Sequence, residues 1–365
     1  MKRIVSLLLV LALCATSFAA LAQGTTLAGE SDRMINGVKK LADGTYEDNP
    51  IVPGESPTTG LKWDGIENYQ PMLVQIDTTE GGLGFRAPWG AEFADIIYET
   101  PLYKSGVTRM SFLFSDYLPT AAGPVRSARV GHCWMREEWG AGFLFYGSQE
   151  LKGSSCNAVF RATGADKKGV IFSGIVGQGK PWAQYYNRVP SLKGPSNVDV
   201  NVRAIRDLIP KSHVAIPHPM LFTDELPKDG ENATVINIPN DHKDYVSSFK
   251  YNADENTYYR FVQDQPYLNR NYETGETKEI PFKNVIIQRT EVGWNEGNGV
   301  APLTEHIGKG NADIFIGGKY IAGYWERPNW GSRTVFLDEN GEEIKFQRGR
   351  TFILVTTYAA PVMYE

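Results

Sequence analysis

Short apolar runs separated by turn residues are the feature that most constrains how this chain can fold. Runs of about four to eight residues rich in β-branched and aromatic side chains, bounded by Gly, Pro, Asn and Asp, are typical of β-strands. In the first half such runs lie at residues 72–76, 93–100, 107–114, 143–146 and 170–172. In the second half they lie at residues 234–238, 245–251, 257–262, 285–291, 313–316, 334–337 and 350–356. This density predicts sheet throughout, with little else in the second half.

Two segments have helical periodicity instead. Apolar residues recur at helical spacing between residues 197 and 209, Asn197 is a suitable N-cap, and Pro210 ends the segment. A weaker pattern predicts a second helix over residues 130–139. We therefore expect an α+β fold: a mixed-sheet N-terminal domain with a few helices, followed by a mostly β C-terminal domain.

The chain is long enough for two hydrophobic cores, since its 365 residues exceed one typical domain. Residues 23–56 are polar and interrupted by Gly, Pro and Asp, which predicts a loosely ordered tether. Pro, Asp and His concentrate again at residues 210–232, which predicts a linker or a long surface connection. The expected domains are residues 57–225, which are α+β, and residues 226–365, which are mostly β.

The N-terminus has the pattern of a secretory signal peptide. Lys2 and Arg3 precede an apolar run at residues 4–22 that ends in Ala20-Leu21-Ala22. We expect cleavage after Ala22, so that residues 1–22 are removed and the rest is exported; the alternative is a retained membrane anchor. Cys14 is preceded by Leu13 rather than a small residue, and the apolar run continues past it, so lipid anchoring at Cys14 is the less favoured alternative.

Composition excludes several classes of protein. A hydrophobic content of 42% and an aromatic content of 12% allow a packed interior, so the chain is not intrinsically disordered. Without the two basic residues of the signal peptide, the net charge changes from −5 to −5 − 2 = −7. An acidic chain is a poor general binder of nucleic acid. No second apolar run is long enough to span a membrane.

Two cysteines, Cys133 and Cys156, remain after the signal peptide. Outside the cytoplasm they could form a disulfide, and closing a loop of that length would stabilise the fold by about 3 kcal/mol in the chain-entropy model. The alternative is two buried free thiols, and the sequence leaves both open.

The motifs that usually identify an enzyme are missing. The chain has no His-Glu-x-x-His, no phosphate-binding Gly-Lys-Ser/Thr loop and no Gly-x-Ser-x-Gly, so we expect no metal and no cofactor. His213 and His218 are five residues apart, but the flanking prolines indicate a rigid loop rather than a zinc site. Cys133 beside His132 is not a convincing nucleophile and base, because neighbours in sequence usually point apart.

One cluster of charged residues stands out just after the third predicted strand. The run Gly123-Pro124-Val125-Arg126-Ser127-Ala128-Arg129 brings two arginines three residues apart. The guanidinium group is a planar fork of donors suited to carboxylate or phosphate groups. Asp77, Glu99 and Arg109 are placed to face this run. The cluster could instead be an internal salt-bridge network that locks the sheet to the following turn.

Several segments together resemble the YerB-like lipoprotein family, also described as domain of unknown function 3048. In the first half they are Pro71-Met72-Leu73-Val74-Gln75-Ile76-Asp77, Ala94-Asp95-Ile96-Ile97-Tyr98-Glu99, Gly106-Val107-Thr108-Arg109 and the Gly123 to Arg129 run. In the second half they are Asn284-Val285-Ile286-Ile287-Gln288, Gly308-Lys309-Gly310, Gly323-Tyr324-Trp325-Glu326-Arg327 and Gly349-Arg350-Thr351-Phe352-Ile353. The resemblance implies a location in the cell envelope and a two-domain layout, without an established activity.

The resemblance also marks candidate ligand-binding residues. Those on the characteristic motifs are Asp77, Arg86, Glu99, Arg109, Arg126, Ser127 and Arg129. The chain departs from the family in lacking a convincing lipidation site and in two other segments. Residues 145–149 replace a His-Gly-Gly-Ser-like segment, and Ser196 stands where a Pro-His-Asn segment would have its histidine.

Three functions remain open from the sequence. The first is a cell-envelope protein that binds an anionic ligand, a wall polymer or a peptide, through the arginine cluster. The second is an envelope hydrolase or transferase with Asp77 or Glu99 as acid or base. The third is a scaffold for an envelope protein, using β edges or the aromatic residues of the second half. The missing nucleophile–base pairs and the absent histidines favour binding. The aromatic residues Tyr320, Tyr324, Trp325, Trp330 and Trp294 are expected mainly to pack in the core.

Overall fold

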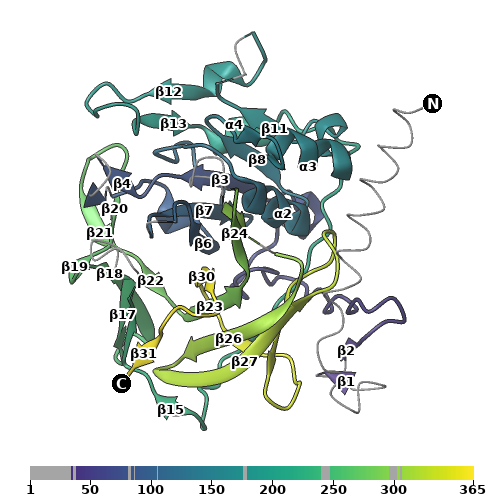
Figure 1. Cartoon of the computed structure of the whole chain (residues 1–365), viewed down its shortest axis with the longest axis vertical. Helices are drawn as coiled ribbons and strands as arrows, with labels where there is room; N and C mark the ends of the chain where they lie inside the picture. Colours follow the sequence, from purple (N-terminus) through teal and green to yellow (C-terminus); the bar gives the residue numbers. More distant parts are fainter. Residues whose placement is uncertain are drawn as a thin grey trace.

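The computed structural model describes residues 34–35, 38–80, 84–85, 87–104, 106–175, 179–239, 247–295, 302–304 and 306–365. The predicted signal peptide lies outside the described residues, and so does the candidate Arg86. One long sheet runs through the molecule, and the helices gather at the end built from the first half of the chain (Figure 1).

Among the described residues the central sheet has 11 strands and is mixed. Its order is β11 (Ile171–Ser173), β8 (Gly142–Phe145), β3 (Met72–Ile76), β7 (Thr108–Phe114), β6 (Ile96–Pro101), β30 (Thr351–Thr357), β23 (Asn284–Thr290), β26 (Gly308–Ile316), β27 (Lys319–Arg327) and β15 (Glu231–Asn232), with β28 (Val335–Asp338) also paired to β27. Strand β30 pairs in parallel with both β6 and β23. The two predicted domains therefore share one continuous sheet.

A second sheet and a group of helices cover the two faces of the central sheet. The second sheet has the order β19 (Gln265–Pro266), β18 (Thr257–Val262), β17 (Ser247–Asn252), β16 (Val235–Ile238) and β31 (Met363–Tyr364), with β22 (Pro281–Phe282) paired to β18. The helices are α2 (Val130–Trp139), α3 (Cys156–Thr163) and α4 (Val202–Arg206), with the 3-10 turns η1 (Ile66–Asn68), η2 (Ala91–Phe93), η3 (Ala165–Lys167) and η4 (Ala183–Tyr185).

Seven short strand pairs complete the described part. They are β1 (Met34–Ile35) with β2 (Val38–Lys39), β4 (Thr79–Glu80) with β5 (Gly84–Phe85), β9 (Glu150–Leu151) with β10 (Ser154–Ser155), β12 (Tyr186–Arg188) with β13 (Val198–Val200), β14 (Leu221–Thr223) with β29 (Lys345–Gln347), β20 (Leu268–Arg270) with β21 (Thr277–Glu279), and β24 (Val292–Trp294) with β25 (Pro302–Thr304).

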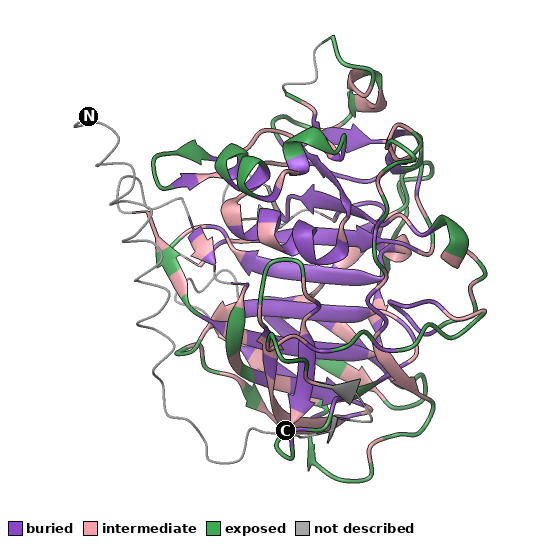
Figure 2. Ribbon diagram, turned by 90° about the vertical axis from the view of Figure 1, so that its right-hand side faces the viewer, coloured by how far each residue is buried: buried purple, intermediate pink, exposed green. Residues whose placement is uncertain are grey.

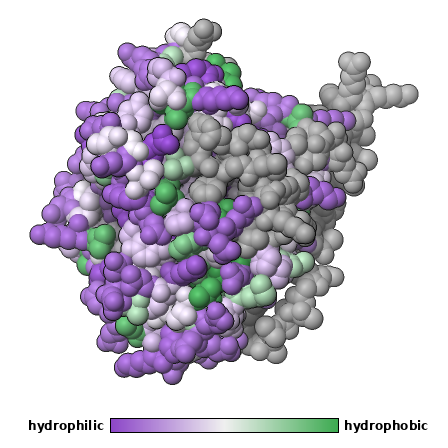
Figure 3. All heavy atoms as spheres, turned by 90° about the vertical axis from the view of Figure 1, so that its left-hand side faces the viewer, coloured by the Kyte–Doolittle hydropathy of each residue, from purple (hydrophilic) through white to green (hydrophobic). Residues whose placement is uncertain are grey.

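Both faces of the central strands are buried. Successive side chains of a strand point to opposite faces, so each strand contributes to a core on either side of the sheet. Val74 and Ile97 pack with Phe249 of the second sheet, whereas Leu73 on the opposite face packs in the core that contains Met135 of α2. Figure 2 shows the central strands almost wholly buried, with exposed residues in peripheral loops. On the face drawn in Figure 3, hydrophilic residues predominate and hydrophobic ones are scattered among them. The apolar runs of the sequence thus form two cores, one on each side of the sheet.

The α+β prediction, with a β-rich second half, is confirmed, and each predicted strand has a counterpart in the described residues. The helix predicted at residues 130–139 is confirmed as α2. The helix predicted at 197–209 is largely wrong: residues 198–200 form β13, and α4 begins only after Asn201, whose side chain accepts a hydrogen bond from the backbone N–H of Ala204. The pairing of β13 with β12 and with Ala122 outweighs the helical spacing of the apolar residues. The β-branched valines of this segment also favour a strand.

The predictions of a loose tether and of a linker need correction. Tyr46 packs on Val335 and Leu337, and its hydroxyl donates to Glu326 at 2.7 Å. The hydroxyl of Ser56 donates to Asp116 at 2.6 Å. Within the predicted linker, β14 pairs with β29. Apolar and hydrogen-bonding side chains hold these segments against the rest of the fold, although their composition is polar. No helix in the described residues is long and apolar enough to cross a membrane.

Candidate functional site

Three arginines and one aspartate meet where β3 ends. The backbone N–H of Asp77 donates to the carbonyl of Pro124 at 2.8 Å, so the Gly123 to Arg129 run lies directly beside the strand end. Arg126 Nε is 3.2 Å from Asp77 Oδ2, and Arg109 Nη2, from β7, is 3.9 Å from Asp77 Oδ1. Arg129 follows three residues after Arg126. We call Asp77, Arg109, Arg126 and Arg129 the arginine cluster.

The cluster has more positive than negative charge. Burial lowers the pKa of Arg109 to about 10, an effect that the nearby Arg129 and Arg126 reinforce and that Asp77 opposes. Burial likewise lowers the pKa of the Arg129 guanidinium. Both groups remain charged at neutral pH, and the cluster contains three guanidinium groups and one carboxylate. This surplus of positive charge attracts an anion.

Two guanidinium groups of the cluster have unused donors. Arg109 Nη1 donates to the carbonyl of Ser127 at 3.3 Å, and Arg129 Nη1 donates to the carbonyl of Ala128 at 3.0 Å. The Nε atoms of both arginines are buried and make no hydrogen bond within the described residues. The side chain of Arg126 is 29% exposed, so the cluster is open to solvent at this residue. Buried donors without partners are costly, and an anionic ligand would satisfy them.

Two distant segments complete the site. The Ser196 hydroxyl donates to Asp77 Oδ2. The backbone N–H of Tyr146 donates to the carbonyl of Arg126 at 2.9 Å, and the Ser127 hydroxyl donates to the carbonyl of Tyr146 at 3.1 Å. These two segments, residues 145–149 and the one containing Ser196, are those in which the sequence departs from the family that it resembles. The structure brings both to the arginine cluster.

Arg188 is a rim residue that the sequence analysis missed. Its guanidinium carbon lies 5.5 Å from the centre of the Tyr146 ring, and its Nη1 donates to Asn197 Oδ1 at 2.8 Å. Asn197, predicted as a helix N-cap, therefore fixes this arginine instead. Arg188, at the end of β12, lies outside the motifs found in the sequence, and only the tertiary structure brings it to Tyr146.

Glu99 binds a different partner from the one expected. Both of its carboxylate oxygens accept from Arg260 Nη2 of β18, at 2.9 and 2.8 Å, and Oε1 also accepts from Thr108 at 2.6 Å. The Arg260 guanidinium lies over the Tyr267 ring at 4.4 Å. Glu99 and Arg260 are both buried, so this ion pair joins the central sheet to the second sheet. A residue chosen as a ligand-binding candidate is thus engaged in a structural pair.

His132 supports the backbone of the cluster. Its Nδ1 accepts from the backbone N–H of Arg129 at 3.0 Å, and its Nε2 lies 2.9 Å from the Thr100 hydroxyl. Burial holds the pKa of His132 well below its usual range, so the ring is neutral at pH 7. With Nδ1 accepting, the proton resides on Nε2 and is donated to Thr100. The ring is 1% exposed, so it fixes the start of α2 and does not face a ligand.

Both cysteines lie beneath the cluster as free, buried thiols, which is one of the two states that the sequence left open. The Cys133 thiol donates to the carbonyl of Arg129 at 3.4 Å. Burial and the neighbouring Cys156 raise the pKa of Cys133 well above its usual value. Since the thiolate is the nucleophile, Cys133 is unreactive at neutral pH.

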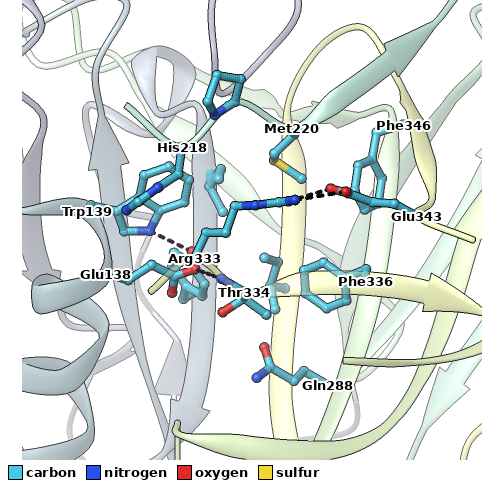
Figure 4. Close-up of a pocket in the computed structure, with 14 residues that line it drawn as sticks. Glu138, Trp139, His218, Met220, Gln288, Arg333, Thr334, Phe336, Glu343 and Phe346 are labelled. Carbon is cyan, nitrogen blue, oxygen red and sulfur yellow. Dashed lines mark hydrogen bonds and ion pairs between the residues drawn. The ribbon is translucent and has the colours of Figure 1, made fainter. Parts of the chain in front are cut away.

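A small cavity lies between α2 and the second half of the chain (Figure 4). Its volume is about 20 Å³, which admits about one water molecule. The charged side chains around it are paired: Arg333 Nη1 lies 2.6 Å from Glu343 Oε1, and Glu138 accepts from the backbone N–H of Thr334 at 2.7 Å. The cavity is therefore a packing feature between the two halves, and the arginine cluster is the better candidate site. No group of three or more potential metal ligands occurs within the described ranges.

Comparison with known proteins supports the resemblance noted in the sequence. The model for the protein of unknown function (DUF3048) N-terminal domain matches residues 58–215, and that for the DUF3048 C-terminal domain matches residues 236–353. The crystal structure of YerB protein from Bacillus subtilis is similar, with a TM-score of 0.66 and 20% identity, over 85% of this chain and 99% of that chain. At this identity the likeness concerns the fold alone. A search of curated proteins gave no match. With both of its domains matched and the fold shared with YerB, the chain belongs to the DUF3048 family.

Proposed function

We propose that this protein is an exported cell-envelope protein that binds an anionic group, a carboxylate or a phosphate of the wall polymer, at the arginine cluster. The observation that carries the proposal is the excess of guanidinium groups: Arg109 and Arg126 lie 3.9 and 3.2 Å from the Asp77 carboxylate, and Arg129 adds a third positive charge that acts on Arg109. Arginine donors bind carboxylate and phosphate oxygens through strong charge-assisted hydrogen bonds. The signal-peptide pattern of residues 1–22 supports the location.

The groups around the cluster favour binding over catalysis. Asp77 accepts from Ser196 and pairs with Arg126, Glu99 pairs with Arg260, and His132 is buried and neutral. Each of these acid–base groups is engaged in holding a neighbour. The free donors belong to arginines, which do not exchange protons at neutral pH. A site of this composition holds an anion without transforming it.

The test is co-sedimentation of the mature protein with purified cell-wall sacculi. The variant Arg126→Ala/Arg129→Ala should lose binding by at least about tenfold, since each charge-assisted hydrogen bond is worth about 1.5–3 kcal/mol. The control Lys152→Ala/Arg161→Ala also removes two positive charges, from exposed positions away from the cluster, and should bind as the wild type does.

Circular dichroism should show that both variants are folded. Equal sedimentation of the two variants, or no sedimentation of the wild type, would contradict the proposal. Wall fragments released into the supernatant would favour a hydrolase instead.

A further inference from the structure

A second, larger cavity opens at the other end of α2. The arginine cluster lies at the N-terminal end of this helix, whereas Arg136 and Gly140 at its C-terminal end line a cavity of about 580 Å³. Lys167, the loop after Pro210 and the segment around Trp330 form the other walls. Small-molecule sites generally measure roughly 300–1,000 Å³. The proposed function makes no use of this cavity.

The inner wall of the cavity carries a buried cation with an unused donor. Arg136 is 1% exposed; its Nε donates to the carbonyl of Ala141 at 2.6 Å, and its Nη1 pairs with Glu137 at 2.9 Å. Its Nη2 has no hydrogen-bond partner within the described residues. A buried N–H without a partner is costly unless a ligand accepts from it.

The two carboxylates of the cavity wall are already neutralised. Glu137 also accepts from the Thr163 hydroxyl at 2.8 Å. Glu138 lies 3.6 Å from Arg327 Nη1 and accepts from the backbone N–H of Thr334 at 2.7 Å.

The exposed Lys167 and Lys168, in contrast, make no ion pair in the described part of the chain. Burial lowers the pKa of His213, so this ring adds no charge at neutral pH. The cavity therefore has a surplus of positive charge.

The outer wall is apolar and open to solvent. Val214 is 77% exposed, Ile216 is 61% exposed and Trp330 is 42% exposed, and all three line the cavity. Large apolar side chains gathered at the mouth of a cavity expose surface that a ligand would remove from water. Positive charge inside and apolar surface at the mouth define an amphiphilic site.

We propose that this cavity binds a small soluble amphiphilic carboxylate, with an anionic head and an apolar chain of medium length. The head would accept from Arg136 Nη2 and from the Lys167 and Lys168 ammonium groups. The chain would lie on Val214, Ile216 and Trp330. Both parts contribute affinity, so a ligand lacking either part binds more weakly.

Isothermal titration calorimetry of the mature protein with octanoate tests this inference. Octanoate should bind at least about tenfold more tightly than either of two comparison ligands, a difference of about 1.4 kcal/mol in binding free energy. These ligands are acetate, which lacks the chain, and octyl glucoside, which lacks the charge. Lys167→Ala/Lys168→Ala and Trp330→Ala should each weaken octanoate binding about fivefold or more. All three are surface changes that leave the core intact.

Lys152→Ala/Arg161→Ala again provides the charge-matched control and should bind octanoate as the wild type does. Absence of octanoate binding, equal affinity for octyl glucoside or acetate, or wild-type affinity in both cavity variants would each overturn the inference. Since neither cavity variant touches the arginine cluster, failure here leaves sacculus binding unaffected, and the two proposals can fail separately.

Discussion

At the scale of single residues, Arg109 distinguishes two interpretations of the arginine cluster, a binding site and a structural salt-bridge network. It is 2% exposed, and its nearest carboxylate oxygen, on Asp77, is 3.9 Å away. Burying a guanidinium group costs several kcal/mol, and an ion pair this long returns little of that cost. Asp77 meanwhile has two closer partners, Ser196 and Arg126. In a structural network Arg109 would contribute stability, whereas in a binding site it would be retained for its charge.

Arg109→Met separates these interpretations. Because Asp77 keeps Arg126 and Ser196, we expect the free energy of unfolding to change by less than about 1 kcal/mol, while sacculus binding weakens through the loss of one positive charge. The control Arg260→Met leaves Glu99 buried without its cation and should cost about 3–5 kcal/mol. Urea unfolding monitored by tryptophan fluorescence measures both. A loss for Arg109→Met as large as that for Arg260→Met would show that the cluster is a structural network.

His306 gives the fold a dependence on pH. It is 4% exposed, and burial lowers its pKa to about 3, with Arg327 adding to the effect. A histidine with a lowered pKa in the folded state favours folding above its unfolded pKa of about 6.5, and this stability is lost as the pH falls below that value. Asp95, whose pKa burial raises to about 8, contributes with the opposite sign.

We therefore expect His306→Gln to remove one source of acid sensitivity. Between pH 6.5 and pH 5, the wild type should lose about 2 kcal/mol more stability than the variant, since each pH unit corresponds to about 1.4 kcal/mol for one proton. Urea unfolding of both proteins at several pH values gives the difference, in which the contribution of Asp95 cancels. Parallel pH profiles of the two proteins would contradict this assignment.

At the scale of elements, local patterns predicted most strands but not the partners of their side chains. Strand β3 and helix α2 follow from apolar periodicity because each presents a regular apolar surface to a core. The segment at 197–209 was predicted wrongly because the long-range pairing of β13 outweighs local spacing. The Asp77–Arg126 contact followed from neighbouring motifs, whereas the Glu99–Arg260 pair joins residues from different halves, and no local pattern encodes it.

Helices α2 and α3 place Cys133 and Cys156 next to each other in a closed core. Both residues are 0% exposed, and burial raises the pKa of Cys133. We therefore expect iodoacetamide at pH 7 to label neither thiol in the folded protein and to label both in urea without reductant. Intact mass spectrometry distinguishes the results. Rapid labelling of the folded protein would contradict the burial, and failure to label in urea would show that the two cysteines form a disulfide.

At the scale of the whole molecule, the two halves share one sheet. Strand β30 lies between β6 and β23, with Ile97 opposite Phe352 and Glu99 opposite Leu354. The sequence indicated two domains because the chain is long and its composition changes near residue 210, and two family domains do match. It could not indicate a shared sheet, because parallel pairing between strands so distant in the chain leaves no local pattern.

This shared sheet predicts a single cooperative unfolding transition. Residues 57–225 expressed alone would lack β30 and leave β6, whose side chains are buried on both faces, as an open apolar edge. Such an edge pairs with other chains, so we expect this fragment to aggregate while the whole mature chain stays monodisperse. Calorimetry and urea unfolding of the whole chain, followed by circular dichroism and fluorescence, should give coincident transitions. Two separated transitions, or a monodisperse and folded fragment, would mean that the β6–β30 pairing joins two independently stable domains, and the Glu99–Arg260 pair would then act only as a latch between them.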